Sequence, residues 1–66
     1  MQLLINGQAQ DVQAATMASL AETLGIAEKT GIALALNEQV IPKAEWPSAL
    51  LQSNDKIIII RATQGG

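Results

Sequence analysis

Two short runs of aliphatic residues, one near each end of the chain, set the strongest limit on how this sequence can fold. The first run is Leu3-Leu4-Ile5, and the second is Ile57-Ile58-Ile59-Ile60. Short runs of bulky aliphatic residues are typical of buried strands, and β-branched residues favour the pleated backbone. We therefore expect the first and last strands to lie side by side in the centre of one sheet.

The first run ends at Asn6-Gly7, the dipeptide best suited to a two-residue turn in which both central residues have a positive φ. Residues 2–5 and 8–13 are therefore expected to pair as a hairpin. The second arm is rich in polar residues, which suits a strand at the edge of the sheet.

One amphipathic helix is expected next. Four apolar residues recur at the spacing of a single helix face: Met17, Leu20, Ala21 and Leu24. Thr16 is the expected N-cap, and Gly25 is the expected C′ residue, which limits the helix to about two turns. A helix this short is marginal alone and must be held by packing on the sheet.

The middle of the chain predicts a second hairpin. Large and small apolar residues alternate over 32–36, which is the period of a strand, and Asn37-Glu38 supplies a turn. Residues 39–41 return as a short strand that ends at Pro42, because proline cannot donate to the ladder.

The segment 43–51 is expected to form a turn or a short 3₁₀ segment. It would drop Trp46 and Leu50 onto the sheet, with Trp46, the only aromatic residue, filling the core rather than binding a ligand. Asn54-Asp55 then turns the chain into the final strand.

The element order is therefore β-β-α-β-β-β, an α+β fold with a single mixed sheet of four or five strands and one main helix on one face. Sixty-six residues make one domain, residues 1–66. The end of the chain, residues 63–66, has no apolar residue to pack, and we expect it to be a flexible tail.

Composition excludes several classes of function. The chain has no Cys and no His, which removes the usual nucleophile, general base and zinc ligands, so we expect neither an enzyme nor a metal site. The net charge is −2 and the basic residues are scattered, which argues against nucleic-acid binding. With no membrane-spanning apolar run and no signal-peptide pattern, we expect a cytoplasmic protein without membrane contact.

The tail is the predicted working part: Gln64, Gly65 and Gly66 follow closely on the central final strand. Glycine has no Cβ, so such a tail can thread a narrow channel and place its carboxylate in another protein's active site. That carboxylate becomes reactive once it is adenylated with ATP, because a sulfur or amine nucleophile can then displace AMP. Paired glycines also arise where a domain is cut at a flexible linker.

A second candidate site is the sheet face opposite the helix. If Ile57 and Ile59 face the helix, the strand period places Ile58 and Ile60 on the other side, near Leu4. That face is then an exposed docking surface, or it is buried by the segment around Trp46. Five carboxylates offer no expected acid-base pair, because they lie at positions of solvated helix faces or turns: Glu22, Glu28, Glu38, Glu45 and Asp55.

Several of these motifs together resemble the small sulfur carrier family of thiamine biosynthesis, within the β-grasp or ubiquitin-like superfamily. The similarity covers nearly the whole chain. It runs through Leu3 to Gly7, Thr16 to Leu24, Ala33-Leu-Ala-Leu-Asn37, Val40-Ile41-Pro42, Trp46, Asp55 and Gly65-Gly66. The middle part, from the Ala/Leu strand to Trp46, is the most discriminating.

The resemblance implies a β-grasp fold and a carrier that is acted upon. In this family an adenylating, E1-like partner activates the residue that corresponds to Gly66 with ATP and Mg²⁺, and the carrier itself binds no cofactor. Sulfur from a persulfide donor then yields a thiocarboxylate, which thiazole synthase uses to build the thiazole ring. Two positions depart from the pattern: Asn54 replaces a common Gly, which concerns turn geometry, and Gln64 replaces a common small residue, which concerns fit in the partner's channel.

Three alternatives remain at this stage. The small subunit of molybdopterin synthase shares the fold, tail and thiocarboxylate chemistry, but it is usually longer and lacks the Val-Ile-Pro and Trp pattern. The chain could also be a ubiquitin-like modifier conjugated through Gly66, or an interaction module whose tail has no chemical role.

Overall fold

Seven elements make up the part of the chain that the computed structural model describes, residues 1–61. They are β1 (Gln2–Ile5), β2 (Gln8–Asp11), α1 (Met17–Thr23), β3 (Ile32–Leu36), β4 (Gln39–Ile41), the 3₁₀ helix η1 (Lys43–Ser48) and β5 (Lys56–Arg61). This is the element order that the sequence predicts.

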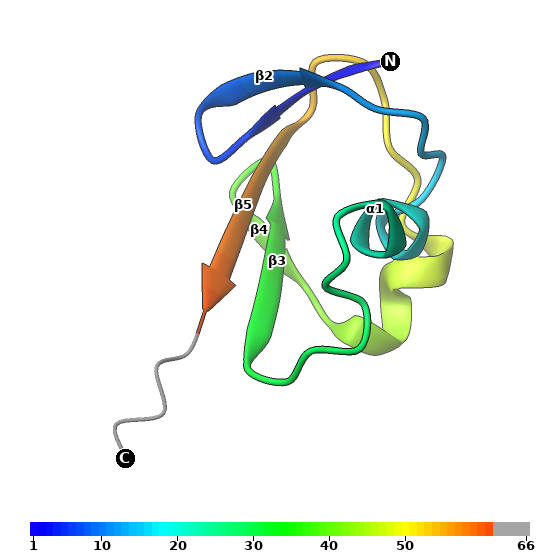
Figure 1. Cartoon of the computed structure of the whole chain (residues 1–66), viewed down its shortest axis with the longest axis vertical. Helices are drawn as coiled ribbons and strands as arrows, with labels where there is room; N and C mark the ends of the chain where they lie inside the picture. The colour runs from blue at the N-terminus through cyan, green and yellow to red at the C-terminus, as the bar shows by residue number, and fades with distance from the viewer. Residues whose placement is uncertain (62–66) are drawn as a thin grey trace.

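The five strands form one mixed sheet in the order β2-β1-β5-β3-β4. β1 and β5 are parallel and adjacent, with Leu4 paired to Lys56 and Ile5 to Ile57, while β3 runs antiparallel to β5 on its other side. The most apolar strands therefore lie in the centre, as predicted. Figure 1 shows α1 and η1 on the same side of this sheet.

Both predicted hairpin turns are present, and both use left-handed backbone. Asn6 and Gly7 have φ values of 51° and 81°, and Asn37 and Glu38 have φ values of 49° and 74°. Two consecutive residues with positive φ match the right-handed twist of the strands that they join. The predicted second arm of the first hairpin, 8–13, was too long: β2 ends at Asp11, because Val12 leaves the edge of the sheet and is 8% exposed in the core.

The helix begins and ends where the sequence indicates. The Thr16 hydroxyl accepts the Ser19 amide at 3.1 Å, which caps the first turn. Gly25, just after the C-cap Leu24, has a φ of 74°, the left-handed conformation that glycine adopts at low cost. Met17, Leu20 and Ala21 are buried against the sheet, so packing holds this seven-residue helix.

One hydrophobic cluster lies between the sheet and the α1–η1 layer. Leu3, Leu20, Leu34 and Ile57 are fully buried within it. Trp46 closes one end, being 4% exposed and donating its indole N–H to the Ile41 carbonyl oxygen at 2.9 Å. The prediction that Trp46 fills the core is confirmed.

The prediction that Leu50 packs onto the sheet was wrong. Leu50 is 71% exposed, and its neighbour Leu51 is buried instead. The backbone becomes extended at Ala49, and the Leu51 N–H donates to the Ala15 carbonyl at 2.9 Å. Successive residues of an extended segment point to opposite sides, so anchoring Leu51 inward turns Leu50 outward.

Candidate functional site

The final strand, β5, is the last described element before the predicted tail. β5 lies between two strands, bonded to β1 on one edge and to β3 along five consecutive residue pairs on the other. Arg61 is the last described residue, so the predicted tail residues Gln64, Gly65 and Gly66 lie outside the described part of the chain. The structure thus describes the chain up to Arg61, two residues before the predicted tail.

The start of β5 is held by a cluster of polar groups. The Asn37 side chain donates to the Asp55 carboxylate at 3.1 Å and accepts the Lys56 N–H at 2.9 Å. The other Asp55 oxygen accepts the Gln52 N–H at 2.8 Å. Asp55 therefore joins the turn before β5 to the β3–β4 turn. These bonds explain why Asn37 and Asp55 suit their positions.

Strand register decides which side chains face away from the helix. Ile57 and Ile59 point toward the core, and Ile58 and Ile60 point to the other side, as the strand period predicts. Pairing carries this face across the sheet to further apolar residues. We call this surface the open face, and its apolar residues are Leu4, Ala9, Ala33, Ala35, Val40, Ile58 and Ile60.

Three of the larger side chains of the open face are exposed, whereas Ala35 is buried. Leu4 is 41% exposed, Ile60 is 44% exposed and Val40 is 57% exposed. The segment around Trp46 packs with α1 on the opposite side, so it does not cover this face. Of the two alternatives left open by the sequence, the described residues 1–61 therefore favour the exposed one. Such a contiguous aliphatic surface is typical of a docking site.

Val40 is the largest open-face residue that sequence reasoning missed. The Asn37-Glu38 turn pairs Ala35 with Val40, and Ala35 in turn pairs with Ile58. A two-residue turn fixes this register, so the signal was present in the sequence. One charged residue adjoins the patch: exposed Lys56 pairs with Leu4 across β1 and β5.

The rest of the described surface offers little for catalysis. Glu22, Glu28, Glu38 and Glu45 are exposed, as their sequence positions indicate. No three acidic side chains within residues 1–61 gather closely enough to hold a metal ion.

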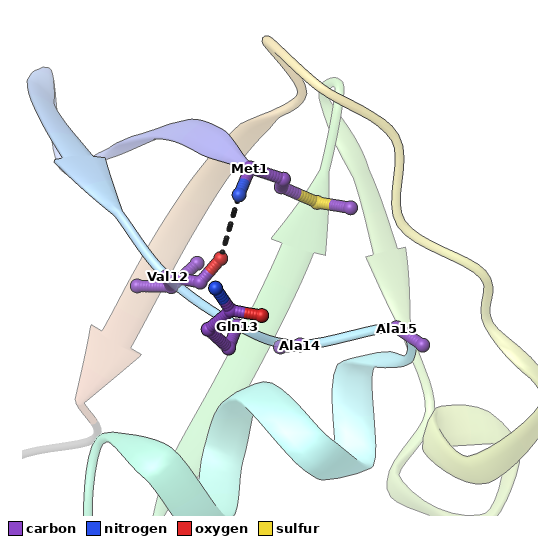
Figure 2. Close-up of a pocket in the computed structure, with 5 residues that line it drawn as sticks. All are labelled: Met1, Val12, Gln13, Ala14 and Ala15. Carbon is purple, nitrogen blue, oxygen red and sulfur yellow. Dashed lines mark hydrogen bonds between the residues drawn. The ribbon is translucent and has the colours of Figure 1, made fainter.

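Two hollows among the described residues 1–61 lie away from Leu4, Ile58 and Ile60. One is lined by Met1 and residues 12–15, where the Met1 amino group donates to the Val12 carbonyl at 3.0 Å (Figure 2). The other lies beside the end of α1 and is lined by Glu22, Gly25, Ala27 and Glu28.

Comparison with known proteins decides the family. The family model described as ThiS matches residues 3–66. The chain belongs to the ThiS family. The sulfur carrier protein ThiS of Escherichia coli (strain K12) is 36% identical over 67 residues, and the alignment covers 100% of each protein. Membership of this family supports the role of a sulfur carrier in thiamine biosynthesis.

Solved ThiS structures confirm the β-grasp fold. A crystal structure of the thiamine biosynthesis protein ThiS from Geobacter metallireducens gives a TM-score of 0.84 at 22% identity, covering 100% of both chains. The solution structure from the same organism gives 0.79, covering 100% of this chain and 88% of that one. No helix of residues 1–61 is long and apolar enough to cross a membrane.

Proposed function

We propose that this protein carries sulfur as a thiocarboxylate on Gly66 and donates it to thiazole formation in thiamine biosynthesis. The observation that carries the proposal is the ThiS family match, which extends through residue 66. The central position of β5 supports it, because a strand that pairs with β1 at its start and with β3 as far as Arg61 gives the tail a firm base. The carrier binds no cofactor and is a co-substrate of its partners.

Conversion of the Gly66 carboxylate to a thiocarboxylate takes three steps. A Gly66 carboxylate oxygen attacks the α-phosphorus of ATP in the partner enzyme, with Mg²⁺ on the phosphates, and pyrophosphate leaves. The terminal sulfur of a persulfide donor then attacks the acyl carbon, and AMP leaves to give an acyl disulfide. A second thiol of the donor system then attacks the donor sulfur of that acyl disulfide, which forms a disulfide within the donor system and releases the thiocarboxylate. Because ATP is consumed, we place this chemistry in the cytoplasm.

The tail residues have separate roles in this proposal. Gly65 and Gly66 pass through the narrow part of the adenylating enzyme's channel, since they have no side chain to clash with its walls. Gln64 marks the limit of that narrow part and contacts the channel wall. Replacing Gln64 by Ala is expected to change the KM for the activating enzyme and to leave the fold unchanged.

The open face is the proposed docking surface for the adenylating, E1-like enzyme and for thiazole synthase. Leu4, Ile58 and Ile60 are its centre, and Val40 extends it toward the edge of the sheet. Exposed aliphatic side chains gain free energy when a partner removes them from water. The strand that supplies Ile58 and Ile60 also leads into the tail, so docking there would bring the tail to the partner's active site.

Intact-mass analysis of the protein isolated from its own host during thiamine starvation tests the proposal. We expect a fraction of molecules in which one oxygen is replaced by sulfur, and none in a variant that lacks Gly66. Finding only the unmodified chain would contradict the proposal. Conjugates of higher mass would favour a protein modifier, and rescue of a deletion strain by molybdenum cofactor instead of thiamine would favour the molybdopterin pathway.

A further inference from the structure

The side chain of Asn6 joins the turn after β1 to the middle of β5. Its Oδ1 accepts the Ile59 N–H at 2.8 Å, across 53 positions of sequence. Its own N–H donates to the Ile57 carbonyl at 2.9 Å. Asn6 therefore makes two hydrogen bonds to the final strand, although β1 ends at Ile5.

These two bonds continue the pattern of a parallel ladder. Leu4 pairs with Lys56 and donates its N–H to the Asp55 carbonyl at 2.9 Å. Asn6 donates to Ile57 in the same pattern, two residues farther along. In a continuing parallel strand, the next bond would join a main-chain carbonyl to the Ile59 N–H. Asn6 has a φ of 51° and begins the turn, and its side-chain oxygen takes that place.

The bond to Ile59 lies close to the base of the tail. Beyond Ile59, the described pairs of β5 are made with β3 alone, Ile60 with Ala33 and Arg61 with Ile32. Within residues 1–61, the Asn6 side chain is therefore the last described hydrogen bond that β5 receives from the β1 side. This bond holds the β1-facing edge of β5 at Ile59, shortly before the tail.

We infer that Asn6 is a positioning residue that sets the direction in which the C-terminal tail leaves the sheet, a role that rests on the proposed function. A second reason for asparagine here is the turn, which needs a residue that tolerates positive φ. The two reasons for asparagine place different demands on the residue. The turn requires only the backbone conformation, whereas positioning requires the side-chain acceptor.

Two variants of Asn6 isolate the acceptor. Asn6→Gly keeps the turn and removes the acceptor, and Asn6→Asp keeps an oxygen acceptor in the same place and tolerates the same φ. Asn37→Gly is the matched control. It removes a side chain that also sits at positive φ and also bonds to β5, but at the start of the strand, far from the tail.

Two measurements are made on each folded variant. The first is the rate of amide hydrogen exchange, and the second is the steady-state kinetics of ATP-dependent tail activation by the host's adenylating enzyme. In Asn6→Gly we expect the Ile59 amide to exchange about fivefold faster and kcat/KM for activation to fall about fivefold, in line with the loss of one hydrogen bond. We expect Asn6→Asp to stay near wild type in both. Asn37→Gly should lower stability and leave kcat/KM unchanged.

Equal kcat/KM values for Asn6→Gly and Asn6→Asp would overturn the positioning role, as would an equal loss in Asn37→Gly. If Asn6→Gly does not fold, the same change is made together with the stabilising Glu38→Gly, which places glycine at another positive φ, and is compared with Glu38→Gly alone. Absence of any ATP-dependent activation of the wild-type chain would refute the proposed function and this role together. An active wild type with an unchanged Asn6→Gly variant would refute the positioning role alone.

Discussion

Replacing two residues of the open face by threonine tests whether that face binds the activating enzyme. Leu4 and Ile60 are 41% and 44% exposed, so each leaves a little under half of its side chain for a partner to cover. Threonine keeps the preference for strand structure while it removes most of the apolar surface. The double variant Leu4→Thr, Ile60→Thr is therefore expected to fold and to bind more weakly.

The exposed fractions give the size of the effect. Full burial of a Leu or Ile side chain is worth roughly 1.5–3 kcal/mol, so covering the exposed part of each contributes about 0.6–1.3 kcal/mol. Two such residues together contribute roughly 1–2.5 kcal/mol, which corresponds to a weakening of about 5- to 70-fold. Threonine retains one methyl group, so we expect a value near the lower end, about tenfold.

The assay is a titration of the host's adenylating enzyme with each carrier, combined with the KM for ATP-dependent activation. Leu50→Thr is the control, because Leu50 is 71% exposed but lies beside α1, where its backbone bridges Thr16. It should bind like wild type. Unchanged binding by the double variant, or equal weakening by Leu50→Thr, would refute the docking surface.

Two further predictions concern the stability of the fold. Glu38 has a φ of 74°, so Glu38→Gly should raise the free energy of unfolding by about 0.5–1 kcal/mol after the entropy cost of glycine is deducted, seen as a later urea midpoint. An earlier midpoint would contradict the claim of strain. Trp46→Phe removes the indole donor to the Ile41 carbonyl and leaves a cavity, so it should destabilise by about 2–3 kcal/mol in the same assay. A loss below about 0.5 kcal/mol would show that Trp46 is not an essential core residue.

Sequence reasoning predicted the elements correctly where local rules decide them. The Asn6-Gly7 turn, the Thr16 cap and the end of the helix before Gly25 all depend on φ preferences or hydrogen bonds within a few residues. Asn54 belongs with them: it lies in the predicted Asn54-Asp55 turn, and its φ is 73°. The errors, at Val12 and Leu50, occurred where an extended segment leaves regular structure, since its side-chain period no longer identifies the buried side.

The sequence by itself determined the order of the elements along the chain, the central place of the two aliphatic runs, and the ThiS resemblance that the family match confirmed. Only the tertiary structure decided that the face carrying Ile58 and Ile60 is exposed and that the Asn6 side chain reaches Ile59. The physical reason is distance along the chain. Turns and caps are set by neighbouring residues, whereas exposure of a sheet face and a bond across 53 positions exist only after the strands have paired.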